Sequence, residues 1–234
     1  MIGGNPPVAA ADHESAAATD LERTQAIGNG FRPMPAIPVY LATVCLERNR
    51  WGSRKPSFQV SHWLPRLAAD GFDSVELWEN HYLAADADEQ ARLRAAAGGI
   101  AVFNSYAGLG DGDADGQQRR RATEAVLGLR AAAVKYNLGG DPRHLGAYRR
   151  NLLAWADDLP SACRLLCECH PGTVLEDPGE AAAFFADLDA SRFGVIAHAC
   201  GEAAEVEPWL TALGPRLRHL HLQLRQPEQV TPLV

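Results

Sequence analysis

The chain has 234 residues, of which 47% are hydrophobic, and this is enough for one large apolar core. Its formal net charge is −7 and its Lys and Arg residues are scattered. A surface that binds nucleic acid concentrates basic side chains, so we expect no nucleic-acid partner. No apolar run is long enough to cross a bilayer and the N-terminus does not read as a secretory signal, so we expect a cytoplasmic protein with no membrane partner.

Residues 1–36 mix Pro, Gly, Ala and charged residues without the periodicity of a helix or a strand. We expect a disordered or extended arm in this segment. The remaining chain, residues 37–234, is expected to form a single barrel domain.

From residue 37 onward, short apolar runs that suit buried parallel strands alternate with longer amphipathic segments that suit helices. Strands are predicted at 39–46, 74–78, 100–106, 133–138, 164–169, 194–198 and 217–222. Helices are predicted at 60–69, 87–96, 117–128, 145–157, 178–188 and 202–213. Strand–helix units repeated in this way typically curl into a (β/α)8 barrel, the TIM-barrel fold.

Two features qualify the fold prediction. An open doubly wound α/β sheet is the alternative, but the first strand is followed by ERNRWGSRKPS instead of a Gly-rich phosphate-binding turn. After Leu222 too few residues remain for a helix and an eighth strand, so we expect a barrel truncated after strand seven. Its open seam would need a cover, and we expect a homo-oligomer or a partner subunit there.

Polar residues end several of the predicted strands, and in TIM barrels the carboxyl ends of the strands carry the chemistry. Glu168, His198 and His221 end strands five, six and seven. A carboxylate with two imidazoles suits Mn²⁺, Co²⁺, Zn²⁺ or Fe²⁺, whereas Mg²⁺ prefers more oxygen ligands; the identity of the ion stays open, Mg²⁺ included. One histidine alone on an apolar strand is more often a hydrogen-bonded core residue, but three ligand-type side chains at successive strand ends favour a metal site.

The same mouth contains candidate catalytic and substrate-binding residues. Glu168, Glu76 and Lys135 are candidates for moving a proton, and His170 for positioning a hydroxyl group. For Lys135 an equally good interpretation is a structural ion pair with Glu76 or Glu168. Further residues are candidates for contact with a small polyhydroxylated substrate: Trp51, Trp78, His81, Asn104, Tyr106, Asn137 and His219. Aromatic residues at such positions more often pack in the core.

Five segments lie at or near these strand ends: GFDSVELWENH, VKYNLG, LLCECHPGTVLEDP, FGVIAHACG and RLRHLHLQLR. In this order they resemble the sugar phosphate isomerase/epimerase family of xylose-isomerase-like TIM barrels. The resemblance spans nearly all of the chain from Val39 to Leu224. The E-x-H-P-G-T and H-x-H-L segments are its more specific parts.

This resemblance implies a metal ion held by a carboxylate from strand five, a ligand from strand six, a histidine from strand seven and a carboxylate from strand eight. Carried over by position, the first is Glu168 and the third is His221. At strand six the family has Asp followed three residues later by His, whereas this chain has His198 and Gly201. The eighth-strand carboxylate has no counterpart, which departs from epimerisation by two carboxylate bases.

These observations lead to several functional hypotheses. The first is a divalent-metal-dependent isomerase or epimerase that removes a proton next to a metal-bound carbonyl or hydroxyl of a small sugar or polyol. A metal-dependent lyase or dehydratase needs a single base and is the first alternative. A degenerate barrel that acts as a non-catalytic binding subunit is the second. Repair of abasic DNA, an activity of the same superfamily, is disfavoured by the acidic charge balance and the lack of further ligands.

Overall fold

The computed structural model describes residues 37–47, 54–96, 98–199 and 206–222. In these residues seven parallel strands form one sheet whose spatial order follows the sequence. The strands are β1 (Tyr40–Ala42), β2 (Ser74–Trp78), β3 (Ile100–Asn104), β4 (Ala133–Tyr136), β5 (Arg164–Glu168), β6 (Phe193–Ala199) and β7 (Leu217–Leu222). This order confirms the predicted barrel type, because a doubly wound sheet reverses its strand order near the middle. The predicted N-terminal arm lies outside the described residues.

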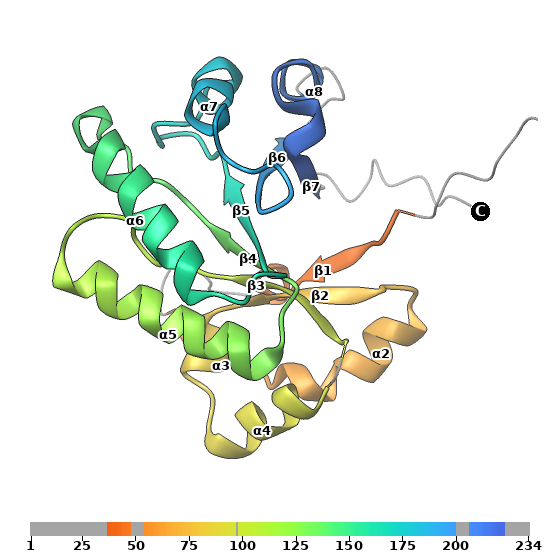
Figure 1. Cartoon of the computed structure of the whole chain (residues 1–234). Helices are drawn as coiled ribbons and strands as arrows, with labels where there is room; N and C mark the ends of the chain where they lie inside the picture. The colour runs from red at the N-terminus through yellow and green to blue at the C-terminus, as the bar shows by residue number, and fades with distance from the viewer. Residues whose placement is uncertain (1–36, 48–53, 97, 200–205, 223–234) are drawn as a thin grey trace, which may run out of the picture. The chain divides into compact units, whose positions relative to one another are not determined.

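Helices connect the strands and lie along the outer side of the curled sheet (Figure 1). The α-helices are α2 (Leu64–Ala69), α3 (Asn80–Leu83), α4 (Ala87–Ala95), α5 (Asp113–Leu129), α6 (Leu145–Asp158), α7 (Pro178–Phe185) and α8 (Glu207–Leu213). The 3₁₀ helices are η1 (Thr43–Leu46), η2 (Val60–His62), η3 (Pro142–His144) and η5 (Gly214–Arg216). None of the helices in the described parts of the chain is long and apolar enough to span a bilayer.

Side chains at the helix ends explain where two of these helices begin. Asp86 precedes α4 and accepts a hydrogen bond from the backbone N–H of Glu89 at 2.8 Å. Asp177 precedes α7 and accepts from the N–H groups of Gly179 and Glu180, and Pro178 occupies the first helical position. Both aspartates satisfy amides that the helix itself leaves unpaired, so each βα unit begins at a defined residue.

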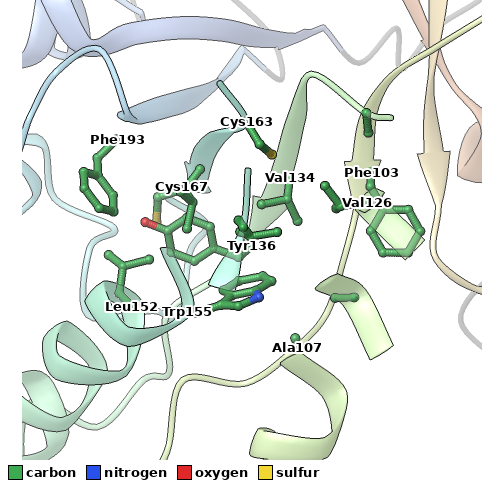
Figure 2. Close-up of a cluster of buried hydrophobic side chains, with 14 of the residues drawn as sticks. Phe103, Ala107, Val126, Val134, Tyr136, Leu152, Trp155, Cys163, Cys167 and Phe193 are labelled. Atoms are coloured by element: carbon green, nitrogen blue, oxygen red, sulfur yellow. The ribbon is translucent and has the colours of Figure 1, made fainter. Parts of the chain in front are cut away.

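The outer face of the sheet packs against the helices and forms the main core. Figure 2 shows Leu152 and Trp155 of α6 beside Tyr136 and Cys167 of β4 and β5. The rings of Tyr136 and Trp155 meet edge to face at 6.1 Å, and all four side chains are buried. Each large apolar side chain buried here contributes roughly 1.5–3 kcal/mol, which fixes the helices on the sheet.

The inner face of the sheet has an apolar level and, above it, a polar level. Val102, Ala133, Leu166 and Ile196, from β3 to β6, are buried and form a separate apolar cluster. Two residues later on the same strands come Asn104, Lys135, Glu168 and His198. Because residues two apart on a strand face the same way, these polar side chains lie inside the barrel at its carboxyl end.

The sheet curls far enough to bring its two ends together. The ring of Tyr40 on β1 stacks on that of His219 on β7, with 5.7 Å between ring centroids. Side chains of β2 and β7 also form hydrogen bonds. Within the described residues β1 and β7 are not paired through backbone hydrogen bonds, so side-chain contacts alone connect these two edges.

Candidate metal centre

The structure brings the three predicted metal ligands together. Oε1 of Glu168 forms hydrogen bonds with Nε2 of His198 and with Nδ1 of His221, the latter at 2.9 Å. The two ring nitrogens are 3.2 Å apart. Three neighbouring strands position them: Glu168 ends β5, and His198 and His221 are register partners on β6 and β7.

The other oxygen of Glu168 is held by two groups from the strand before it and its extension. Nζ of Lys135 lies 2.5 Å from Oε2, and Nδ2 of Asn137 donates to the same oxygen at 3.0 Å. The ammonium of Lys135 also lies over the ring of Tyr106, 4.6 Å from its centroid. Lys135 is 2% exposed, so the ion pair left open as an alternative does form, with Glu168.

A second group of ligand-type side chains shares His221 with the first. Oε2 of Glu76 accepts from Nε2 of His221 at 2.9 Å and lies 3.4 Å from Nε2 of His219. Oε1 of Glu76 accepts from Nδ2 of Asn104 at 2.6 Å. His221 therefore lies between two carboxylates, one on β2 and one on β5.

These contacts shift the protonation of the group. Burial raises the pKa of Glu168, but hydrogen bonds from His198 and His221 and the charge of Lys135 outweigh it and hold that pKa well below its usual range. Burial also raises the pKa of Glu76, yet hydrogen bonds from His219 and His221 lower it to about 2. Burial lowers the pKa of His221, whereas its hydrogen bonds to both carboxylates raise it to about 9. Two ionised carboxylates and a protonated imidazole follow at neutral pH.

The donor set fits a divalent ion of the zinc or manganese type. Glu168, His198 and His221 offer one oxygen and two nitrogens, all within 4.8 Å of one another. Tetrahedral coordination at about 2.1 Å places ligands roughly 3.4 Å apart, close to the 3.2 Å between the two ring nitrogens. An ion here would replace the protons that the imidazoles share with Glu168.

The remaining predicted site residues fall into different environments. His170 is exposed at the rim, where its ring meets that of His198 edge to face at 5.5 Å. Asn104, Tyr106, Asn137 and His219 surround the carboxylates as described above. Trp51 lies outside the described residues.

Trp78 and His81 are buried, which favours a structural role over the predicted contact with substrate. Nε2 of His81 lies 2.7 Å from Oε1 of Glu47, and its Nδ1 lies 2.9 Å from Oγ1 of Thr43. The ring of Trp78 meets that of His81 edge to face at 5.2 Å, and its backbone N–H donates to Thr43. Glu47 and Thr43 are also buried, so this network braces β1 against β2.

A cavity of about 510 Å³ adjoins the metal centre and shares Tyr106 and Asn137 with it. It lies at the carboxyl ends of β3 and β4, under the loop that leads into α5. Its lining includes Asp111 and Asp115 but no Lys or Arg. A Cβ at Gly108 or at Gly110 would lie 2.5 Å from the carboxylate of Asp115, so the loop needs glycine to wrap around this side chain.

Sequence reasoning missed this cavity and the residues that line it, including Asp111, Asp115, His144 and Tyr148. One signal was available: the segment YAGLGDGDAD, rich in Gly and Asp, directly follows a strand that ends in a candidate site residue. Glu47 and Thr43 had no comparable signal, because their burial depends on how β1 packs beside β2.

The sequence matches no family model, and no curated protein is significantly similar to it. AsbF of Bacillus anthracis, described as the probable 3-DHS dehydratase of petrobactin synthesis, is similar in structure, with a TM-score of 0.64, 13% identity, and coverage of 83% of this chain and 76% of that chain. A Rhodospirillum rubrum protein provisionally assigned as a xylose isomerase is also similar, with a TM-score of 0.57 and 14% identity; the match covers 80% of this chain and 77% of that chain. The IolI protein, crystallised with a bound zinc atom, has a TM-score of 0.52 and 13% identity; the match covers 72% of this chain and 68% of that chain. The chain therefore shares the TIM-barrel fold of these proteins.

Proposed function

We propose that this chain is a divalent-metal-dependent isomerase or epimerase that moves a proton on a small sugar or polyol. The observation that carries the proposal is the convergence of Glu168, His198 and His221 on one point at the carboxyl end of the barrel. The zinc atom bound by IolI, a protein of the same fold, supports a metal-dependent role for this chain. The identity of the ion is open among Zn²⁺, Mn²⁺ and Co²⁺, with Mg²⁺ less suited to two imidazoles.

A divalent ion held here would supply Lewis acidity, polarising a substrate carbonyl or hydroxyl and making the adjacent C–H bond more acidic. Oε1 of Glu168 faces the imidazoles, and Oε2 faces Lys135. Glu168 is therefore a metal ligand in this proposal. Nζ of Lys135, 2.5 Å from Oε2 of Glu168, is the nearest group to it that could transfer a proton. While Nζ pairs with Glu168 as an ammonium it has no lone pair, so it could take a proton from a substrate carbon only after it has given one of its own protons to a substrate oxygen.

The neighbouring cavity is the proposed substrate pocket. Of its two carboxylates, Asp111 already accepts from Arg150 and Asn151, so Asp115 is the one proposed to accept hydrogen bonds from hydroxyl groups and to repel phosphate. The lining itself offers no Lys or Arg to an anion. Tyr106 and Asn137 link it to the metal centre. A volume of about 510 Å³ is enough for a monosaccharide or cyclitol. We infer that the substrate is hydroxylated and lacks a phosphate at the end that enters this cavity.

Elimination of water is the second candidate reaction. Among the described carboxylates of the mouth, Glu76 is fully engaged with imidazoles and an amide, and Glu79 accepts from Ser105 and from the backbone N–H of Tyr106. Lys135 is therefore the proton carrier that lies against the proposed metal ligands. One proton carrier is sufficient for isomerisation or for loss of water, whereas epimerisation inverts a carbon and needs a second, so this arrangement favours an isomerase over an epimerase. The likeness in fold to AsbF, described as a dehydratase, adds weight to this alternative.

Metal analysis of the purified protein tests the proposed centre. We expect about one equivalent of zinc, manganese or cobalt in the wild type and loss of it in Glu168→Ala and His221→Ala. His62→Ala removes an exposed histidine of η2 and is the matched control, with unchanged metal content. If the wild type binds none of these ions after incubation with each, the proposed metal-dependent activity is refuted and a non-catalytic binding role is favoured.

Solvent-exchange measurements then separate the two reactions. The metal-loaded protein is incubated in D₂O with unphosphorylated ketoses, polyols and cyclitols, each paired with its phosphate ester. Isomerisation predicts deuterium at carbon in recovered substrate or product, and elimination predicts a product lighter by one water. Reaction with the phosphate esters alone would contradict the assignment of the acidic cavity as the substrate pocket.

A further inference from the structure

Glu76 on β2 contacts both the candidate metal centre and Asn104 on β3. One of its oxygens accepts from Nε2 of His221 at 2.9 Å, and the other accepts from Nδ2 of Asn104 at 2.6 Å. Both oxygens therefore already accept hydrogen bonds from protein groups, so Glu76 is poorly placed to take a proton from a substrate carbon. This position differs from the catalytic role that the sequence suggests for Glu76.

The contact with His221 determines which ring nitrogen is available to a metal. An imidazole has two nitrogens, and Glu76 engages Nε2. Nδ1 is left facing Glu168 and His198, at 2.9 and 3.2 Å. Carboxylates that accept the second N–H of a metal-bound histidine fix its tautomer and its orientation, and they make the nitrogen that binds the metal more basic.

The contact with Asn104 leaves an unsatisfied acceptor. Asn104 must present its NH₂ group to Glu76, because the flipped amide would place two oxygens 2.6 Å apart. Its Oδ1 then has no hydrogen-bond partner among the described residues, although the side chain is 3% exposed. A buried acceptor without a donor is unfavourable by about 1–3 kcal/mol, so this oxygen calls for a donor from a ligand, such as a hydroxyl group.

Glu76, His219 and His221 would also be close enough to bind an ion of their own, and charge decides between the two roles. Glu76, Glu168 and Lys135 together carry a net charge of −1 when the imidazoles are neutral. One divalent ion changes this to +1, whereas two would leave +3 in a space with little water to screen it. A single ion with Glu76 outside its ligand set is the better balanced arrangement.

We propose that Glu76 is a positioning residue that holds Nδ1 of His221 toward the metal and Oδ1 of Asn104 toward a substrate hydroxyl. The inference rests on the proposed metal-dependent function. It adds that Glu76, on the second strand, orients two side chains: the proposed metal ligand His221 on the seventh strand and the hydrogen-bond acceptor Asn104 on the third.

Zinc affinity is the main test, measured by competition with a chromophoric chelator on the metal-free protein. We expect Glu76→Gln to keep one zinc per chain but to bind it about 10- to 100-fold more weakly than the wild type. Glu89→Gln is the matched control, because Glu89 is an equally buried carboxylate whose partners are Ser61 and Arg92 on the far side of the barrel wall. This control should bind zinc as the wild type does.

Each other outcome overturns the proposal in a recognisable way. Unchanged zinc affinity in Glu76→Gln shows that the contact does not position His221, while the metal centre itself stands. Two zinc ions in the wild type and one in Glu76→Gln make Glu76 a ligand of a second ion. Failure of the wild type to bind zinc, manganese or cobalt removes the proposed function and this inference together.

A spectroscopic measurement on the wild type keeps the inference testable if Glu76→Gln does not fold. In long-range ¹H–¹⁵N spectra of the zinc-loaded protein, we expect His221 to carry its proton on Nε2 and to bind zinc through Nδ1. A proton on Nδ1, or a ring deprotonated at both nitrogens, would refute the assigned role of Glu76.

Discussion

His221 on the seventh strand donates a hydrogen bond to Glu76 on the second strand, across 145 positions of sequence and at 2.9 Å. The same ring contacts Glu168 through its other nitrogen, so one side chain joins carboxylates from two sides of the barrel. Because β1 and β7 are not paired in the described part of the chain, this contact is also one of the few that hold the curled sheet closed. One imidazole thus contributes both to the candidate metal centre and to the closure of the barrel.

The stability of the metal-free protein should fall as the pH rises through the neutral range. The pKa of His221 is about 9 in the folded protein and 6.5 in the unfolded chain. The stabilisation from its protonated form is therefore complete below pH 6.5 and is lost as the pH rises through 9. Urea denaturation between pH 6 and 9 measures this, and His221→Gln should show a flatter profile. An equally steep decline in the variant would contradict the assignment.

Metal affinity should change in the opposite direction over the same interval. Binding at Nδ1 of His221 displaces a proton whose pKa is about 9. The apparent affinity for zinc should therefore rise about tenfold for each unit of pH between 6 and 8. Calorimetry in buffers of different ionisation enthalpy would show release of about one proton per zinc at pH 7. Binding without proton release would mean that His221 is not a ligand.

Lys135 should be needed for proton transfer and not for metal binding. Lys135→Met removes the ammonium that pairs with Glu168 at 2.5 Å but leaves Glu168, His198 and His221 in place. We expect zinc content to stay near one equivalent, while the rate of deuterium exchange into the substrate that the wild type accepts falls by a factor of about 100 or more. Exchange at the wild-type rate in Lys135→Met would remove Lys135 from the mechanism.

His81→Ala should destabilise the protein without affecting the metal centre. The substitution leaves Glu47, whose side chain is 2% exposed, without its imidazole partner. Glu47 would keep the backbone N–H of Ser57 as a donor, and a buried acceptor that loses one of its donors costs about 1–3 kcal/mol in the free energy of unfolding. Urea denaturation measures the loss, with the exposed His62→Ala as control. If stability were unchanged and only substrate affinity fell, the sequence-based prediction of a substrate contact would be the better one.

Gly139→Ala should narrow the substrate cavity. A Cβ at Gly139 would lie 2.2 Å from the hydroxyl oxygen of Tyr148, so the Tyr148 ring must move within the cavity wall. We expect a loss of about 1–3 kcal/mol in stability and a higher KM, with zinc affinity unchanged. Gly146→Ala is the matched control, because a Cβ there meets no atom within 4 Å.

Much of the strand pattern could be predicted because buried parallel strands are short apolar runs with polar residues where they end. The predicted strands 74–78 and 217–222 coincide with β2 and β7. The predicted strand 39–46 is longer than β1, which ends at Ala42 because Thr43 turns to accept from Trp78 and to contact His81. Such a side-chain contact between strands has no signal in a single sequence.

Helix starts were harder to predict where glycine and aspartate mix. The predicted start at Gln117 is four residues after the observed start of α5 at Asp113. Asp113 and Asp115 suit the first turn of a helix, whose N–H groups favour negative charge, although the same residues are also typical of loops. Helix α3 was missed because its four residues are too few for a periodic pattern.

For the candidate site, the sequence could predict which residues belong to it better than which of them contact one another. Strand ends identified Glu168, His198 and His221 as neighbours, and the structure brings them together. The sequence could not show that Glu76 reaches His221, because this distance depends on how strongly the sheet curls. For the same reason the burial of Trp78 and His81 follows from packing between loops and not from any local pattern.

The apolar level formed by Val102, Ala133, Leu166 and Ile196 lies directly beneath the polar side chains of the mouth. These four side chains offer no polar group to water or to a proton, so we expect substrate and protons to reach Lys135 and Glu168 from the carboxyl end of the barrel. An apolar layer lowers the local dielectric constant and so strengthens the charge interactions just above it. The reaction type could therefore change through substitutions in the polar level alone, while the apolar level beneath it stays the same.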